Sequence, residues 1–291
     1  MATTQDNQEM FKALNQTYDR WLNNRFVTSY YQNSRYMNWG YWNDKTLNAK
    51  EACDNLVDTL MGFIDDKKGN ILEVACGAGG ATKRLFQFYK PSDITAINIS
   101  EFQLRLARET APGCNFVLMD ATDLKFQDHS FDNLISVEAA FHFNTREKFF
   151  NEAYRVLKPG GTLVLSDILF SSSLFSKIIS KRSRSLLPGP KKERLSAHPR
   201  RLTHGWHTAD FKTLEDYKTL FIHAGFKSVV VQDITKDTWR KYVFGMLKSI
   251  PTYADGSVQK WIRCFIYWVL FFSYFEITRP VDKYILVSAK K

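Results

Sequence analysis

The sequence predicts an α/β fold, in which a doubly wound sheet of seven strands carries helices on both faces and is extended by helical cap insertions. Two observations predict it. Short, nearly all-apolar segments alternate with segments of helical periodicity, which is typical of parallel strands buried on both faces. The chain has 291 residues, of which 44% are hydrophobic, and this suffices for one large domain with a substantial core.

The individual elements follow from the spacing of the apolar residues. Phe11, Leu14 and Tyr18 recur at intervals of three and four, which predicts an amphipathic helix within 8–35. The sequence Lys-Pro-Gly-Gly at 158–161 is a typical helix stop and turn. We expect strands at 71–74, 94–100, 115–121, 131–137, 162–167, 226–234 and 281–289, and further helices over 47–64, 101–109 and 145–157.

A glycine-rich turn at 75–80 separates the first predicted strand from a helical segment. Glycines let the backbone approach a ligand closely, and the N-terminus of a helix offers free N–H groups. Asn98 lies about 25 residues after Glu73, near the end of the second strand, where a polar side chain meets the ribose in nucleotide-binding βαβ units. Taken alone, this glycine-rich turn is explained equally well by an ordinary strand–helix connection and by a nucleotide-binding loop.

Composition limits the class of protein. The N-terminus is polar and unlike a secretory signal, and the apolar run 261–272 is shorter than the roughly 20 residues that a membrane-spanning helix needs. The four cysteines, at 53, 76, 114 and 264, show no paired short spacing. We therefore expect a cytoplasmic protein with reduced thiols and no metal site.

The net charge of +10 is concentrated in one segment, Lys181–Arg201, which has eight basic residues and one acidic residue. It suits a solvated cap surface, an acidic carrier protein, a phosphorylated substrate or an anionic membrane surface. Nucleic acid is not an expected partner, because stacking aromatics do not alternate with these charges.

Five stations then occur in a characteristic order, and with them the chain resembles the class I S-adenosylmethionine-dependent methyltransferases. It is most similar to their small-molecule branch, the ubiquinone, tocopherol and natural-product O-methyltransferases. The resemblance implies a Rossmann-like methyltransferase fold whose last strand is antiparallel, with S-adenosyl-L-methionine as the cofactor. The stations are Glu73 with Gly77-Ala78-Gly79, Asn98-Ile99-Ser100 with Gln103, Asp120-Ala121, residues 155–161 and residues 213–226.

The resemblance also implies roles in cofactor binding. Glu73 supports the loop, Gly77 and Gly79 lie against the amino-acid part of the cofactor, and Asn98 meets the ribose. Asp120 and the backbone of Ala121 meet the adenine, although Asp120 would equally suit a loop cap. Ile99, Gln103, Glu138 and Tyr41 are further expected contacts, with Tyr41 in an aromatic segment, 36–42, that is either a lid over the ligand or a packed turn.

Two residues depart from the family pattern. Ala75 stands where the first motif glycine is usual, and it fits if its φ is negative. Asn98 stands where an acid usually holds the ribose; an amide can still bond a hydroxyl but brings no charge, so the cofactor affinity could be lower.

Methyl transfer requires alignment of donor and acceptor, exclusion of water and, for a hydroxyl acceptor, removal of a proton. His142 is the candidate base, since its unperturbed pKa of about 6.5 suits this task. A histidine packed between Phe141 and Phe143 is the alternative, and His204 or His207 could be the base instead. Asp167, at the end of the fifth strand, would orient His142 or hold the acceptor hydroxyl.

We expect one domain over 1–291, with a helical lid over 1–64 and cap insertions at 168–210 and 236–275. Phe141, Trp206 and His207 are candidate substrate contacts, and the aromatic segment 236–275 is a packed cap, a wall for an apolar substrate or a membrane-facing surface. The favoured activity is O-methylation of a bulky, largely apolar small molecule. C-methylation of a quinone or prenyl-type lipid, N-methylation, methylation of RNA or protein, and a non-catalytic cofactor-binding module are the alternatives.

Overall fold

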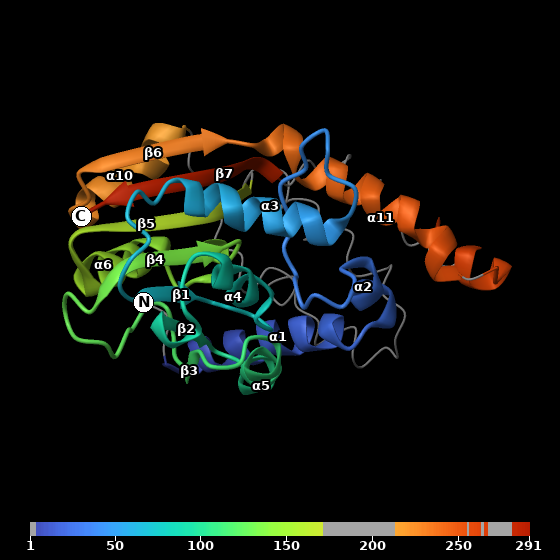
Figure 1. Cartoon of the computed structure of the whole chain (residues 1–291), viewed down its shortest axis with the longest axis horizontal. Coiled ribbons are helices and arrows are strands. Elements are labelled where there is room, and N and C mark those ends of the chain that lie inside the picture. The colour runs from blue at the N-terminus through green and yellow to red at the C-terminus, as the bar shows by residue number, and fades with distance from the viewer. Residues whose placement is uncertain (1–3, 171–212, 255, 263–264, 267–280) are drawn as a thin grey trace.

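A seven-stranded sheet in the order β3-β2-β1-β4-β5-β7-β6 organises the computed structural model, which describes residues 4–170, 213–254, 256–262, 265–266 and 281–291 (Figure 1). β7 runs antiparallel to β5 and β6, and the other neighbours are parallel. The predicted doubly wound, mostly parallel sheet is therefore confirmed. The strands are β1 (Ile71–Val74), β2 (Ile94–Asn98), β3 (Asn115–Leu118), β4 (Phe131–Val137), β5 (Leu157–Phe170), β6 (Ser228–Asp233) and β7 (Val281–Lys290).

Helices cover both faces of the sheet, α3 on one face and α6 and α10 on the other. The segment predicted as one helix over 8–35 contains two, because Asn24 accepts hydrogen bonds from the N–H groups of Phe26 and Val27 and so starts a new helix. The helices are α1 (Thr4–Leu22), α2 (Arg25–Tyr30), α3 (Ala49–Gly62), α4 (Gly80–Arg84), α5 (Glu101–Thr110), α6 (Arg146–Val156), α10 (Leu214–Ala224) and α11 (Trp239–Ala254).

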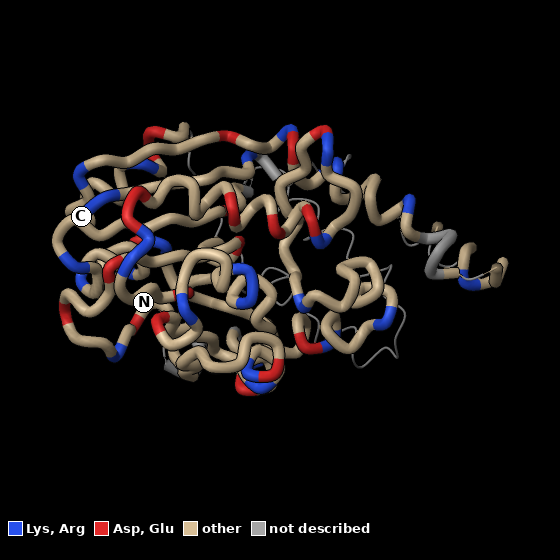
Figure 2. The backbone as a smooth tube through the Cα atoms, in the orientation of Figure 1, with Lys and Arg blue, Asp and Glu red and all other residues tan. Residues whose placement is uncertain are grey.

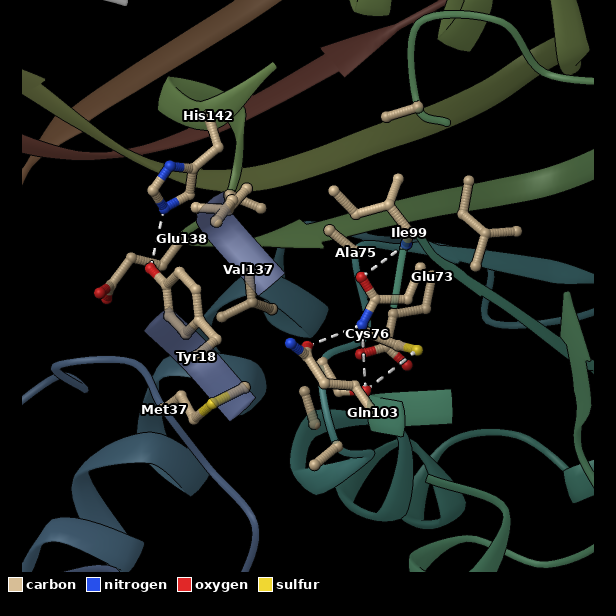
Figure 3. A pocket seen from close by; sticks show the side chains of 18 of the residues that line it. Tyr18, Met37, Glu73, Ala75, Cys76, Ile99, Gln103, Val137, Glu138 and His142 are labelled. Atoms are coloured by element: carbon tan, nitrogen blue, oxygen red, sulfur yellow. Dashed lines mark hydrogen bonds between the residues drawn. The ribbon is translucent and has the colours of Figure 1, made fainter. Parts of the chain in front are cut away.

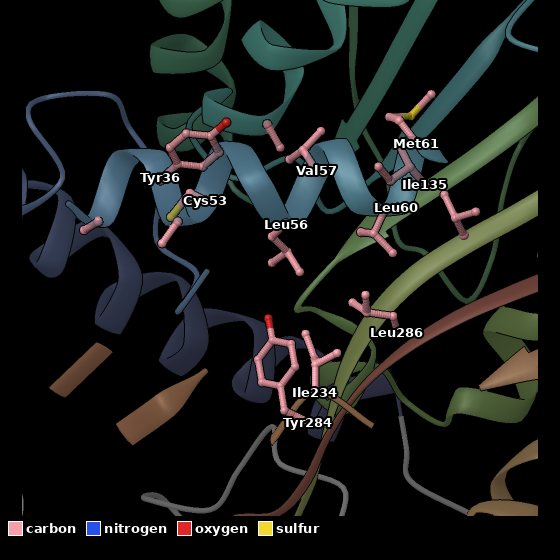
Figure 4. Packing of buried hydrophobic residues seen from close by; sticks show 14 of the residues in the cluster. Tyr36, Cys53, Leu56, Val57, Leu60, Met61, Ile135, Ile234, Tyr284 and Leu286 are labelled. Carbon is pink, nitrogen blue, oxygen red and sulfur yellow. The ribbon is translucent and has the colours of Figure 1, made fainter. Parts of the chain in front are cut away.

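The hydrophobic core is divided between the two faces because side chains alternate along each strand. Ile71 packs in the cluster that includes α3, whereas the next residue, Leu72, packs in the cluster that includes α6 and α10. On the first face, Leu56 and Leu60 of α3 lie above Tyr284 and other strand residues (Figure 4). The 1–64 segment therefore contributes to the core through α3.

Charge is mixed over the part of the chain that the structure describes, where basic and acidic residues are interspersed (Figure 2). The basic segment Lys181–Arg201 lies outside the described residues. α11 packs on the core through Trp239 and Tyr242 and then extends away from the sheet (Figure 1). None of the helices in the described ranges is both long and apolar enough to cross a membrane.

A buried ion pair joins three elements on the α6 face. The Asp167 carboxylate in β5 accepts hydrogen bonds from Arg146 Nε at 2.6 Å and from the Tyr217 hydroxyl of α10 at 2.8 Å. Its other oxygen accepts from Arg146 Nη2 and from the backbone N–H of Ile168. Both carboxylate oxygens therefore serve this pair on the α6 face, and the structure does not bring Asp167 together with His142 in the pocket wall as predicted.

We predict that Asp167→Asn lowers the free energy of unfolding by about 3 kcal/mol, because it leaves the Arg146 guanidinium buried without its counter-charge. Tyr217→Phe, which removes one hydrogen bond to the same carboxylate, should cost only about 1 kcal/mol. Urea denaturation of both variants measures the difference. Equal stability of Asp167→Asn and the wild type, combined with lost turnover, would instead support a catalytic role.

Candidate cofactor and acceptor site

The turn between β1 and α4 forms the floor of the site. Gly79 precedes α4 with a left-handed φ of 87°, and a Cβ there would lie 2.9 Å from the Cα of Ala107 in α5. Glycine is needed at this position so that the turn can approach α5. Gly77 and Gly80 line the pocket beside this turn and Gly79 does not, so the structure does not place Gly79 against the cofactor as predicted.

Three residues other than glycine adopt left-handed backbone conformations in the pocket wall: Arg35, Ala75 and Glu138. Ala75 has a φ of 61°, so the expectation of a negative φ is wrong. The alanine accepts the conformation that the usual glycine would take, at a cost of roughly 1–2 kcal/mol. Glu138, after β4, has a φ of 51°. Strain of this kind persists where the surrounding structure enforces it, often at functional sites.

One pocket collects most of the predicted cofactor residues at the carboxyl ends of β1, β2, β3 and β4 (Figure 3). Ligands bind at this edge in open α/β sheets. Asp120 lines the pocket and also caps its own turn, since its Oδ1 accepts hydrogen bonds from the Thr122 N–H and hydroxyl. The predicted residues in the lining are Glu73, Gly77, Asn98, Ile99, Gln103, Asp120, Ala121, Glu138 and His142.

Two predicted contacts lie elsewhere. Tyr41 packs on the hydrophobic cluster of α3, and its N–H donates to the carbonyl of Ala52. Phe141 is buried in the same cluster, with its ring centroid 4.1 Å from that of His142. Within the described residues, these two rings pack on the core cluster and do not line the pocket, so the structure does not bring them to the other predicted residues. Trp206, His207 and His204 lie outside the described residues.

The N-terminal helix α1 forms a part of the pocket wall that the sequence motifs did not predict. Phe11, Leu14, Asn15 and Tyr18 line the pocket, and their spacing places them on one face of the helix. The periodicity of this helix was visible in the sequence, but not the surface that it covers. The lining also includes Arg35, Tyr36, Met37, Asn38, Cys76, Ala78, Ala81, Ile97, Met119, Val137, Ala139 and Phe143.

Glu73 presents an unsatisfied acceptor to the pocket. Its side chain is buried, and within the described residues its Oε2 has no hydrogen-bond partner. Burial raises the pKa of this carboxyl to about 8, against the opposing effect of the neighbouring Thr82 hydroxyl. A buried acceptor without a donor is costly unless a ligand completes it. The ammonium group of S-adenosylmethionine would do so, and the residues present therefore fit this cofactor.

Glu138 joins the N-terminal segment to the end of the sheet. Its Oε2 accepts hydrogen bonds from the backbone N–H of Trp39 at 2.8 Å and from the Tyr284 hydroxyl at 2.6 Å. Burial raises the pKa of Glu138 to about 8. A second carboxyl with a raised pKa, which is partly buried, thus borders the pocket on the side opposite Glu73 and Gln103 (Figure 3).

Tyr18 and His142 meet beside Glu138. The Tyr18 hydroxyl lies 2.8 Å from Nε2 of His142, and the two rings are perpendicular. His142 is buried, and the pKa of Tyr18 is raised well above its usual value, first by burial and then by the Glu138 carboxyl. A nitrogen base and a hydroxyl are therefore in contact at the pocket wall (Figure 3).

The fold and the pocket are similar to those of the class I, S-adenosylmethionine-dependent methyltransferases, as the resemblance implied. Residues 72–165, from β1 to β5, match a family described as "Methyltransferase domain". The structure of the cyclopropane synthase MmaA2 from Mycobacterium tuberculosis superposes with a TM-score of 0.68 over 97% of this chain and 98% of that one. At 16% identity this similarity shows a shared fold alone.

Two relatives are named as methyltransferases of natural products. Erythromycin 3''-O-methyltransferase of Saccharopolyspora erythraea is 33% identical over 141 residues, which are 46% of each chain. The 27-O-demethylrifamycin SV methyltransferase of Amycolatopsis mediterranei is 29% identical over 213 residues, 69% of this chain and 71% of that one. The chain thus matches about half the length of the first of these relatives.

We predict that S-adenosylhomocysteine, which carries the same ammonium group, binds more weakly as the pH falls from about 8 to about 6. Below a pKa of about 8, Glu73 is protonated in the free protein, and the cation must displace that proton, at a cost of up to about tenfold in affinity per pH unit. Calorimetry across this range measures the slope.

Glu73→Gln should bind more weakly and flatten this dependence, leaving the contribution of Glu138. Glu101→Gln, at the exposed start of α5, is the matched control and should keep the wild-type slope. An unchanged slope in Glu73→Gln would exclude Glu73 as the group that responds to the ammonium.

Proposed function

We propose that the protein transfers a methyl group from S-adenosylmethionine to a hydroxyl of a bulky, largely apolar small molecule in natural-product metabolism. The contact between Tyr18 and His142 carries this proposal, because it places a candidate base next to a hydroxyl at the pocket wall. The named O-methyltransferase among the relatives supports an oxygen acceptor. Apolar walls from Phe11, Leu14 and Phe143 suit an apolar substrate.

The cofactor supplies an electrophilic methyl group when it is bound. Glu73 would hold its ammonium group, Gly77 would lie along its amino-acid part, and Asn98 with Gln103 would meet the ribose. Asp120 and the Ala121 backbone would meet the adenine, and Ile99 and Glu138 would complete its surroundings. Apolar residues from α1 exclude water from this space, which strengthens the polar contacts inside it.

The proton of the acceptor hydroxyl would pass to Nε2 of His142. A hydroxyl already lies 2.8 Å from this nitrogen in the Tyr18 side chain, so the geometry accommodates an oxygen donor there. Tyr18 would either transmit the proton, giving its own to Nε2 as it accepts the acceptor's proton, or move aside. Because burial disfavours the phenolate of Tyr18, a relay must move both protons together.

Carbon or nitrogen acceptors are the alternative. C-methylation of a quinone or prenyl-type lipid would use the same pocket, and the fold shared with a cyclopropane synthase is compatible with chemistry at carbon. The caps at 168–210 and 236–275, with Trp206 and His207, would then select the acceptor. The basic segment Lys181–Arg201 would face a carrier protein or a membrane surface.

We predict that His142→Ala abolishes turnover while S-adenosylhomocysteine binds with nearly wild-type affinity, because His142 acts on the acceptor and not on the cofactor. Tyr18→Phe, which keeps the ring and removes the hydroxyl, should lower kcat less. Initial rates and calorimetry measure the two effects. Unchanged turnover in His142→Ala would reject it as the base and leave His204 and His207 as candidates.

Incubation with labelled S-adenosylmethionine and a small-molecule extract, followed by mass spectrometry, tests the proposed reaction. We expect label in an apolar small molecule as a methyl ether. A methyl group attached to carbon or nitrogen would favour the alternatives, and label in RNA or protein would overturn the substrate class. Binding of the cofactor with no transfer to any acceptor would indicate a non-catalytic module.

A further inference from the structure

A chain of hydrogen bonds runs from the N-terminal helix to the glycine loop through the ribose side of the pocket. Asp19 of α1 accepts from Nε2 of Gln103 at 3.0 Å, and Gln103 Oε1 accepts from Nδ2 of Asn98 at 2.9 Å. The same Nδ2 lies 3.3 Å from the carbonyl oxygen of Gly77. Three segments that are far apart in the sequence, at residues 19, 77 and 98–103, are therefore linked by two side-chain amides and one carboxylate.

The groups at the two ends of this chain fix the orientation of both amides. The Ile99 N–H donates to Asn98 Oδ1 at 2.8 Å, and the Gly77 carbonyl accepts from Nδ2, so Asn98 cannot turn over without losing both bonds. At the other end, the Asp19 carboxylate only accepts hydrogen bonds, so Gln103 must direct its NH2 group to it. Gln103 Oε1 is thereby left as an acceptor beside Asn98.

A carboxylate of α1 is bonded to the amides at this side of the pocket. In nucleotide-binding βαβ units, a carboxylate at the end of the second strand takes the ribose hydroxyls, and Asn98 has none. Asp19 bonds the NH2 group of Gln103, and a charged acceptor at one end of an amide strengthens the oxygen at the other end as an acceptor. Asp19 itself does not line the pocket, whereas Asn98 and Gln103 do.

We propose that Asp19 is a positioning residue for the cofactor ribose, which supplies through Gln103 the negative charge that Asn98 lacks. The ribose hydroxyls donate to the amide oxygens of Gln103 and Asn98, and the carboxylate of Asp19 makes this end of the pocket favourable for them. The contribution exists only while α1 lies over the strand ends. This inference depends on the cofactor, and not on which acceptor is methylated.

A purely structural role for Asp19 is the competing explanation, because the residue also fastens α1. Its Oδ1 accepts from the Ser100 hydroxyl at 3.3 Å, next to the N-terminus of α5. Asn15, one turn earlier on α1, fastens the same helix by donating to the carbonyl oxygen of Ile99 at 3.1 Å. Asn15 does not join the amide chain, so Asn15→Ala is the matched control for loss of fastening.

Binding of S-adenosylhomocysteine by calorimetry, without any acceptor, tests the proposal in the full chain. Asp19→Ala should weaken binding by about tenfold, which is the size of one charge-assisted hydrogen bond. Asp19→Asn keeps an acceptor without the charge and should show a smaller loss. This variant carries the test if Asp19→Ala fails to fold.

A second-site substitution separates the two explanations. Asn98→Asp restores a carboxylate on the second strand, so it should return the affinity of Asp19→Ala to within about threefold of the wild type. Asn98→Asp should not raise the affinity of the wild type, because the carboxylate of Asp19 and the one introduced at position 98 would then lie close together in the same short chain of hydrogen bonds. In Asn15→Ala it should give no rescue.

Wild-type affinity in Asp19→Ala, or a failure of Asn98→Asp to rescue it, would overturn the proposal. Equal rescue of Asn15→Ala and Asp19→Ala would also overturn it, because both effects would then arise from fastening of α1. Methyl transfer to hydroxyls is not measured in these experiments, so the proposed activity can fail while this inference holds, and the reverse.

Discussion

Parallel strands that end at one edge of the sheet impose the form of the site. Each of β1, β2 and β4 must turn sharply there into the next segment, and these turns bring Glu73, Asn98 and Glu138 around one pocket. Ala75 and Glu138, which follow β1 and β4, have left-handed backbone conformations at this edge. The buried Glu73 carboxyl, whose Oε2 has no hydrogen-bond partner in the described residues, lies at the same edge.

The carboxyl groups of Asp167, Glu73 and Glu138 have two kinds of surroundings. Asp167 is neutralised within the fold, because Arg146 and Tyr217 satisfy it on the α6 face. Glu73 and Glu138 lie in the pocket wall without a cationic partner in the described residues, and burial raises the pKa of each. The first arrangement stabilises the packing of three elements, and the second leaves the pocket complementary to a cation.

The sequence predicted the sheet well because apolar runs and helix stops are local signals. β4 and the start of β1 and β2 lie where the apolar pattern placed them, and Asn98, Gln103 and Glu138 do line one pocket. The sequence predicted poorly which way individual side chains point, because the direction of a side chain depends on the tertiary packing around it. The sequence predicts Asp167 at the end of its strand, but β5 continues to Phe170 and the Asp167 carboxylate bonds Arg146 of α6. Phe141 is buried in the core cluster and Tyr41 packs against it. The φ of Ala75 likewise follows from the fold, and not from the residue type.

α1 is joined to the sheet mainly at the pocket, through Asn15, Asp19 and Tyr18. A ligand that contacts both α1 and the strand ends therefore stabilises the docked helix by the amount that the docked helix strengthens ligand binding. Local unfolding of α1 and release of the cofactor become one linked equilibrium. Conditions that destabilise the docked α1 helix would then shorten the time for which S-adenosylhomocysteine stays bound. This effect would not require any change in the catalytic groups.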